Sequence, residues 1–149
     1  MLLHFEDQRE AALRLAFTPG LGPVRLRATG TDTAYLADGL RERLVEYRGL
    51  GAKFAKWRAV IDIARPDSGP PIPTYTAIMT NAHALARYAA LCQEAGLVPI
   101  VEPEVLMDAD NTIETCDDVT GRTLRAVYGA LYAFDVHLRG TLLKPNMVI

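Results

Sequence analysis

Residues 97–102, Leu-Val-Pro-Ile-Val-Glu, form a continuous apolar run that ends in a carboxylate. Such a run is typical of a strand in a parallel sheet that is covered on both faces. Apolar residues recur at helical spacing before it, over Ile78–Cys92, and after it, over Ile113–Phe134. Gly96, just before the run, is the expected end of the first of these helices. The stretch therefore predicts a helix, a buried strand and a second helix in succession.

The same alternation continues outward from this unit. Thr33–Tyr47 carries apolar residues at intervals of three and four, which predicts an amphipathic helix that ends near Gly49. Phe54–Ile63 predicts a strand, and four prolines within residues 66–73 predict a loop after it. A last strand is expected over Leu138–Met147. Alternating helices and strands imply parallel strands joined by right-handed helical crossovers.

Composition sets the class of molecule. The chain has 149 residues, of which 50% are hydrophobic and 23% charged, as expected for one globular domain with a real core. A net charge of −2 provides no general positive field for nucleic acid or an anionic membrane. The chain has no apolar run of about eighteen residues and no readable secretory signal, so a cytoplasmic location is expected.

The residues that usually hold metals or cofactors are scattered. The two cysteines and three histidines lie far apart in the sequence and do not show metal-ligand spacing, so we expect neither a zinc site nor a disulfide. No glycine-rich fingerprint opens a helix after a predicted strand, which argues against dinucleotide or P-loop binding. No cofactor is therefore expected.

Polar residues lie in pairs, two positions apart, near the carboxyl ends of the three predicted strands. The pairs are Lys56 and Arg58, Glu102 and Glu104, and Lys144 and Asn146. Residues two apart share one side of a strand, and (β/α)₈ barrels build their active sites at the carboxyl ends of their strands. Between an open doubly wound sheet and a barrel, the pairs favour the barrel. The predicted fold is α/β, a partial (β/α)₈ TIM barrel with about three parallel strands and flanking helices.

Lys144 is the most informative of these residues because it interrupts an apolar strand. An apolar surrounding favours the neutral amine, which is a nucleophile toward carbonyl carbon, so Schiff-base chemistry is one hypothesis. The alternative is a lysine that extends to the rim or pairs with a carboxylate for structural reasons. The matching polar pairs on neighbouring strands favour a catalytic cluster.

Several motifs in this chain resemble one known family. Residues 51–58 (GAKFAKWR), 98–104 (VPIVEPE) and 140–147 (GTLLKPNM) are similar to successive barrel strands of class I fructose-1,6-bisphosphate aldolase, and residues 81–88 (NAHALARY) to its intervening helix. The similarity extends from about Thr29 to Ile149. The expected division is an N-terminal segment, residues 1–28, unlike the family, followed by a partial aldolase barrel over residues 29–149.

The resemblance implies a lyase of glycolysis that cleaves fructose 1,6-bisphosphate to dihydroxyacetone phosphate and glyceraldehyde 3-phosphate without metal. It places Lys144 as the Schiff-base lysine and Glu102 as the carboxylate that moves protons while the Schiff base forms. Lys56 matches the second active-site lysine, which contacts substrate oxygens. Arg58 is expected to contact phosphate with Lys56, and Glu104 to support the lysines, either directly or as a plain ion-pair partner.

The chain is short for this family, because a complete barrel takes roughly 250 residues. The family's first-strand aspartate and its later phosphate-binding positions have no counterpart in the matching motifs. We therefore expect a partial enzyme with little turnover alone, whose open sheet edges favour a homo-oligomer or other association. The alternative is a catalytically silent half-barrel that acts as an interaction or assembly module. A third reading keeps the lyase but changes the sugar phosphate.

Overall fold

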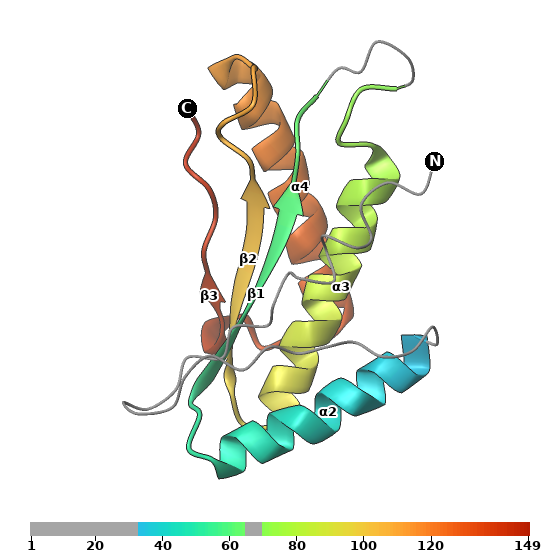
Figure 1. The fold of residues 1–149 in the computed structure, drawn as a ribbon, viewed down its shortest axis with the longest axis vertical. Coiled ribbons are helices and arrows are strands. Elements are labelled where there is room, and N and C mark those ends of the chain that lie inside the picture. Colours follow the sequence, from blue (N-terminus) through green and yellow to red (C-terminus); the bar gives the residue numbers. More distant parts are fainter. Residues whose placement is uncertain (1–32, 65–69) are drawn as a thin grey trace.

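The computed structural model describes residues 33–64 and 70–149. Helices and strands alternate along the chain, and three parallel strands form one sheet in the order β1–β2–β3 (Figure 1). The elements are α2 (Thr33–Gly49), β1 (Phe54–Ile61), α3 (Tyr75–Glu94), β2 (Val98–Val105), α4 (Ile113–Ala133), the 3₁₀ turn η1 (Leu138–Gly140) and β3 (Leu142–Leu143). The predicted α/β class and the order of elements are confirmed. The proposed boundary at residue 28 lies outside the described residues.

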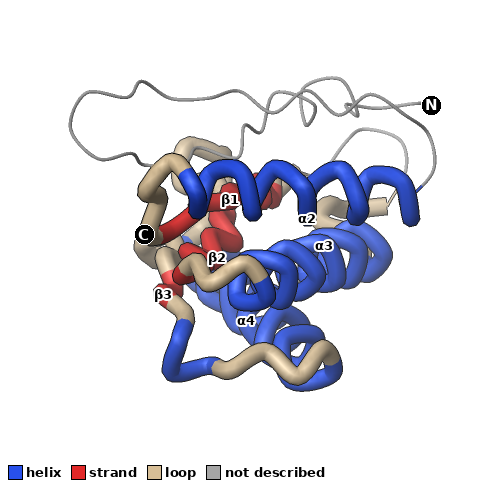
Figure 2. Tube along the Cα trace, turned by 90° about the horizontal axis from the view of Figure 1, so that it is seen from below, coloured by secondary structure: helices blue, strands red, loops and turns tan. Residues whose placement is uncertain are grey.

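Helices α3 and α4 lie side by side on one face of the sheet (Figures 1 and 2). The apolar positions predicted for the inner side of α3 are all buried: Ile78, Ala82, Leu85, Ala89 and Cys92. In α4 the buried positions include Cys116, Val127 and Leu131, whereas Ile113, also expected on this side, is exposed. Ile113 is the first residue of its helix and precedes the part that packs on the sheet.

The ends of these helices follow from local chemistry. Thr74 caps α3 by accepting a hydrogen bond from Ala77 N, and Thr112 caps α4 by accepting one from Thr115 N. Gly96 has φ 73°, in the left-handed region that favours glycine, and the chain turns there directly into β2. The predicted helix stop at Gly96 is confirmed.

The core lies between the sheet and the two helices. Small residues of β1, Ala55 and Ala59, and Val101 of β2 are buried beneath α3. Trp57 also points to this side and meets the ring of Tyr88 edge to face, with ring centroids 5.5 Å apart. Because successive strand residues point to opposite faces, Lys56 and Arg58 must lie on the other face of the sheet.

The last predicted strand, Leu138–Met147, is wrong in extent. The chain forms the 3₁₀ turn η1, then only two residues of β3, and Lys144 N makes the last ladder contact by donating to Val101 O at 2.9 Å. The next ladder bond would need an N–H of Pro103 in β2 to donate to Lys144 O, and a proline has none. The apolar sequence indicated a strand, but the hydrogen-bond donors needed to extend it are missing.

The middle strand is longer than predicted, because β2 continues past Glu102 to Val105. In a parallel sheet, the N–H groups of alternate residues point to opposite neighbours. Val98 N and Leu106 N both donate toward β1, so Pro99 and Pro103 face β3. The two prolines therefore leave the β1–β2 ladder intact and weaken only the edge that receives the short β3.

Candidate active site

Five charged side chains gather on the face of the sheet that lies opposite α3 and α4. They are Lys56 and Arg58 of β1, Glu102 and Glu104 of β2, and Lys144, which directly follows β3. Strand register explains their meeting, because Arg58 pairs with Glu102 across β1 and β2. We call these five residues the charged cluster.

Glu102 is the centre of the charged cluster. Its side chain is only 1% exposed, its Oε1 lies 2.5 Å from Lys144 Nζ, and its Oε2 lies 2.8 Å from Lys56 Nζ. The Lys56 contact is an ion pair by distance, and Oε2 accepts no aligned hydrogen bond from any described residue. A buried carboxylate is stable only when it is compensated, and here two ammonium groups from different strands do so. The structure thus brings Lys56, Glu102 and Lys144 together.

Arg58 and Glu104 form the second half of the cluster. Arg58 Nε and Nη2 each donate to a different carboxylate oxygen of Glu104, which is the two-pronged geometry typical of strong arginine–carboxylate pairs. Hydrogen bonding from Arg58 is the main cause that holds the pKa of Glu104 below its ordinary value, and the same bond raises the pKa of Arg58. A phosphate bound by Arg58 would therefore compete with Glu104 for the guanidinium.

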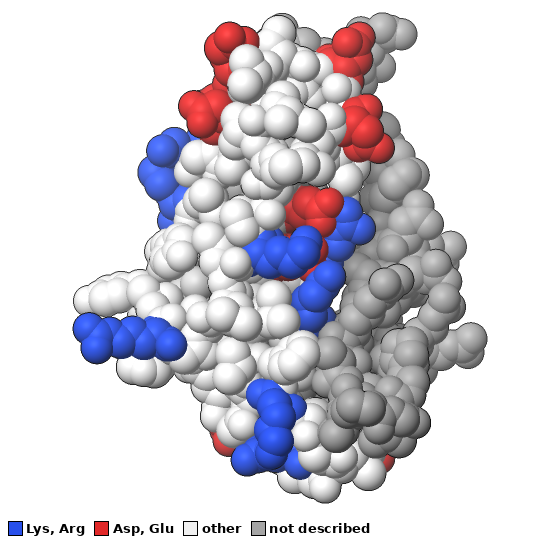
Figure 3. Space-filling view, turned by 90° about the vertical axis from the view of Figure 1, so that its left-hand side faces the viewer, with Lys and Arg blue, Asp and Glu red and all other residues white. Residues whose placement is uncertain are grey.

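The cluster carries three basic and two acidic side chains, so its net charge is positive by one. Figure 3 looks at the side of the molecule where β3 lies in Figure 1, and it shows basic and acidic groups in contact near the middle of that face. Local excess of cation over carboxylate suits an anionic ligand, although the whole chain has a net charge of −2.

Lys144 is less buried than its apolar neighbours in the sequence suggest. Its side chain is 54% exposed, and Leu142 and Leu143 beside it are 55% and 38% exposed. The reason is that β3 is the edge of the sheet among the described residues and that Lys144 points to the face opposite α3 and α4, which these helices do not cover. Its contact with Glu102, and not burial, is what distinguishes Lys144 from other surface lysines.

Asn146 does not join the cluster, although it was expected to share a side with Lys144. Its Oδ1 accepts from Val105 N at 3.2 Å, and its Nδ2 donates to Thr120 Oγ1 at 3.0 Å. The strand geometry on which the expectation rested ends at Leu143. Sequence reasoning also missed Thr120, a buried hydroxyl on α4, for which helical periodicity carries no signal.

The described residues do not form a metal centre, since no three of their histidine, cysteine, aspartate or glutamate side chains gather at one place. Cys92 and Cys116 are both free and buried, and burial raises the pKa of the Cys92 thiol to about 12, which keeps the thiolate from forming. Within the part of the chain that is described, no helix has both the length and the apolar character needed to cross a membrane.

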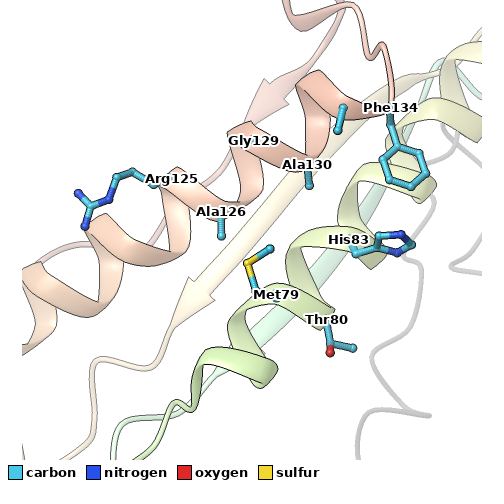
Figure 4. Close-up of a pocket in the computed structure, with 9 residues that line it drawn as sticks. Met79, Thr80, His83, Arg125, Ala126, Gly129, Ala130 and Phe134 are labelled. Carbon is cyan, nitrogen blue, oxygen red and sulfur yellow. The ribbon is translucent and has the colours of Figure 1, made fainter.

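A groove of about 640 Å³ lies elsewhere, between α3 and α4 on the side away from the cluster (Figure 4). It is lined by Met79, Thr80, His83, Arg125, Ala126, Gly129, Ala130, Ala133 and Phe134. His83 and Phe134 meet edge to face at one end, with ring centroids 4.9 Å apart. The lining is mostly apolar and lacks a carboxylate or a lysine, so we assign the chemistry to the charged cluster.

Comparison with known proteins shows the family of the chain. The family model for class I fructose-bisphosphate aldolase matches residues 20–149. The chain belongs to this family. A probable class 1 fructose-bisphosphate aldolase of Xanthomonas campestris pv. campestris is 65% identical over 112 residues, which are 75% of this chain and 32% of that protein. The fructose-bisphosphate aldolase of Dictyostelium discoideum is 47% identical over 142 residues, covering 95% of this chain and 39% of that one.

A solved structure supports the same assignment for this aldolase-family chain. Fructose-bisphosphate aldolase from Plasmodium falciparum, in complex with TRAP and a small-molecule inhibitor, is 50% identical and superimposes with a TM-score of 0.69. The match covers 75% of this chain and 31% of that one. The predicted partial barrel is thereby confirmed. The chain spans about a third of the length of the probable class 1 aldolases of Xanthomonas and Xylella that it matches.

Proposed function

We propose that this chain supplies the Schiff-base centre of a class I fructose-bisphosphate aldolase, which cleaves fructose 1,6-bisphosphate to dihydroxyacetone phosphate and glyceraldehyde 3-phosphate. One observation carries the proposal: two lysines from different strands meet opposite oxygens of one buried carboxylate, with Lys144 Nζ at 2.5 Å and Lys56 Nζ at 2.8 Å. The family membership supports the reaction, and the contact supports the choice of these residues for it.

Lys144 acts as the nucleophile. Its neutral amine attacks the carbonyl carbon of the sugar phosphate and forms a C–N bond, and the former carbonyl oxygen leaves as water once it is protonated. The resulting iminium withdraws electrons from the carbon–carbon bond that breaks, and the electron pair of that bond is held as an enamine. The hydroxyl group on the departing fragment loses its proton in the same step and becomes the carbonyl of the aldehyde product. No metal is needed to stabilise this charge.

Glu102 moves the protons of these steps. Its Oε1 lies close enough to Lys144 Nζ to take the proton of the ammonium and free the amine, and then to return a proton to the departing oxygen. Lys56 stays charged at Oε2 and contacts substrate oxygens. The excess positive charge of the cluster supports binding of a sugar phosphate by Lys56 and Arg58, with Glu104 orienting Arg58.

Borohydride trapping tests the proposal. Incubation with dihydroxyacetone phosphate and sodium borohydride should add the reduced triose phosphate to Lys144, as read by peptide mass spectrometry. Lys144→Arg keeps a positive charge beside Glu102 and should abolish the adduct, whereas Lys53→Arg, at an exposed lysine just before β1, should leave it unchanged. Trapping on another lysine, or on none, would overturn the proposal.

The biological setting belongs to the same proposal. A chain with this activity would act in glycolysis in the cytoplasm, would need no cofactor, and would take part in a homo-oligomer. The positive cluster on a chain of negative net charge supports a small anionic substrate and not nucleic acid or an anionic membrane.

A second candidate is an assembly module without activity, and the edge of the sheet favours it. Leu142, Leu143 and Met147 are all exposed on the side of β3, where an apolar surface invites association. Sedimentation velocity would then show a defined complex that Leu142→Glu dissociates, and borohydride would trap nothing on Lys144. A monodisperse monomer would rule this candidate out.

A further inference from the structure

The segment that carries Lys144 has few backbone contacts of its own. β3 contains two residues, and the bond from Lys144 N to Val101 O is the last backbone bond of its ladder with β2. On the facing edge of β2, Pro99 and Pro103 offer no N–H. The Lys144 side chain is also largely exposed, so packing alone does not hold its amine beside Glu102.

Asn146 replaces the missing ladder after Lys144. Its Oδ1 accepts from Val105 N at 3.2 Å, at the end of β2, where a longer third strand would have supplied a carbonyl. Its Nδ2 donates to Thr120 Oγ1 at 3.0 Å and to Met147 O at 2.8 Å. One side-chain amide therefore ties the chain just past Lys144 to both β2 and the buried face of α4.

Gln93 fixes the chain that precedes Lys144, also through a side-chain amide. From the last turn of α3, its Oε1 accepts from His137 N and its Nε2 donates to His137 O, both at 2.9 Å, as a strand neighbour would do. The same Nε2 lies 3.4 Å from Gly140 O. A Cβ added to Gly140 would lie only 3.1 Å from this Nε2. Gln93 therefore holds the turn η1 tightly against α3.

We propose that Gln93 and Asn146 are positioning residues for Lys144: two side-chain amides clamp the segment 137–147 at both ends and so hold the Lys144 amine on Glu102. The expected effect on catalysis rests on the proposed function. The positioning of Lys144 by the two amides does not, because it follows from their hydrogen bonds alone. Because a displacement of about 1 Å can cost roughly a hundredfold in rate, loosening either clamp should slow Schiff-base formation.

Asn146→Ala and Gln93→Ala test the clamps in the full chain, by borohydride trapping with dihydroxyacetone phosphate. Each should lower the maximal trapping rate by about tenfold to a hundredfold. The triose phosphate concentration that gives half of this rate should stay the same, because neither residue belongs to the charged cluster. Asn81→Ala is the matched control, since among the described residues Asn81 donates only to Ala77 O within α3, and it should trap at the wild-type rate.

Asn146→Asp and Gln93→Glu keep side-chain size and the acceptor oxygen but lose the donated bonds, so they replace the alanine variants if those fail to fold. Acylation of Lys144 provides a readout that needs no substrate. A lysine freed from its carboxylate should react several times faster than in the wild type, as measured by peptide mass spectrometry. If the wild-type chain forms no trapped adduct, the proposed function fails. The acylation rates alone then show whether Gln93 and Asn146 position Lys144. Unchanged acylation and trapping in both clamp variants would overturn the inference.

Discussion

At the scale of the residue, Glu102 is the side chain on which the charged cluster depends. Glu102→Gln keeps the shape but leaves two ammonium groups facing a neutral amide. We expect the free energy of unfolding to fall by about 1–2 kcal/mol, less than for a fully buried pair because both lysines are partly exposed. Urea denaturation measures this loss, and borohydride trapping should vanish in the same variant.

Glu94 provides the control for this charge removal. Its ion pair with Arg41, at 2.7 Å, lies on the surface with both side chains about half exposed. Glu94→Gln should therefore change the free energy of unfolding by no more than about 0.5 kcal/mol. Equal losses in the Glu94 and Glu102 variants would mean that the buried carboxylate has no special place in the structure.

The Arg58–Glu104 pair predicts a dependence on pH. Arg58 lowers the pKa of Glu104 from its ordinary value of 4.5, so the pair stabilises the folded chain above that value. The stabilisation is lost as the pH falls through the lowered pKa, because Glu104 then takes up a proton in the folded chain as well. Exposure of the guanidinium limits the effect to about 1 kcal/mol or less.

Carbon NMR of the Glu104 carboxyl group checks this directly. In the Arg58→Gln variant the titration midpoint of Glu104 should rise toward the ordinary value. The free energies of unfolding of the variant and the wild type should become equal as the pH falls below the lowered pKa of Glu104. Arg122→Gln, which removes a surface pair with Asp118 on α4, should leave the midpoint in place. A Glu104 midpoint that is the same with and without Arg58 would contradict the assignment.

The shared face of the charged residues could be predicted from the sequence, because residues two apart on a strand point to the same face of the sheet. The partners of Asn146 and Gln93 could not. Their amides bond to backbone groups that are left open by short or proline-containing strands, and only the assembled sheet shows which groups those are. The exposure of Lys144 was missed for the same reason, since burial depends on what covers a strand.

At the scale of the element, the helix caps are local and should act independently. Thr112→Ala removes the side-chain acceptor for Thr115 N at the start of α4, and Thr74→Ala the acceptor for Ala77 N at the start of α3. Each should cost about 1 kcal/mol in the free energy of unfolding. Thr80→Ala, at an exposed position inside α3, should be neutral or slightly stabilising because alanine favours the helix. Urea denaturation of the three variants measures these changes in the free energy of unfolding. Equal changes in all three would exclude capping as the cause.

The same locality explains which elements the sequence predicts well. α3 and α4 each bury one side against the sheet, so their apolar residues recur at helical spacing and mark most of their length. The strand expected over Leu138–Met147 failed because an apolar run does not say whether a neighbour offers hydrogen-bond partners. Pro103 on the neighbouring strand decides that, because it has no N–H to donate to Lys144 O, and this effect depends on how the strands pair.

At the scale of the whole molecule, forming the Schiff base and completing the cleavage make different demands. The cluster needs only three strands, and these are present together with the helices that support them. Complete turnover also requires the iminium to be kept from water until the carbon–carbon bond has broken, whereas Lys144 is 54% exposed at the edge of the described sheet. The two steps should therefore separate in this chain.

We accordingly expect the purified 149-residue chain to trap dihydroxyacetone phosphate on Lys144 while cleaving fructose 1,6-bisphosphate orders of magnitude more slowly than a full-length relative. A coupled assay for glyceraldehyde 3-phosphate measures cleavage, and borohydride trapping of the same preparation measures iminium formation. Lys144→Arg should remove both signals, which excludes a contaminating aldolase. Turnover within about tenfold of a full-length relative, a barrier difference of only about 1.4 kcal/mol, would show that the three-strand sheet is sufficient.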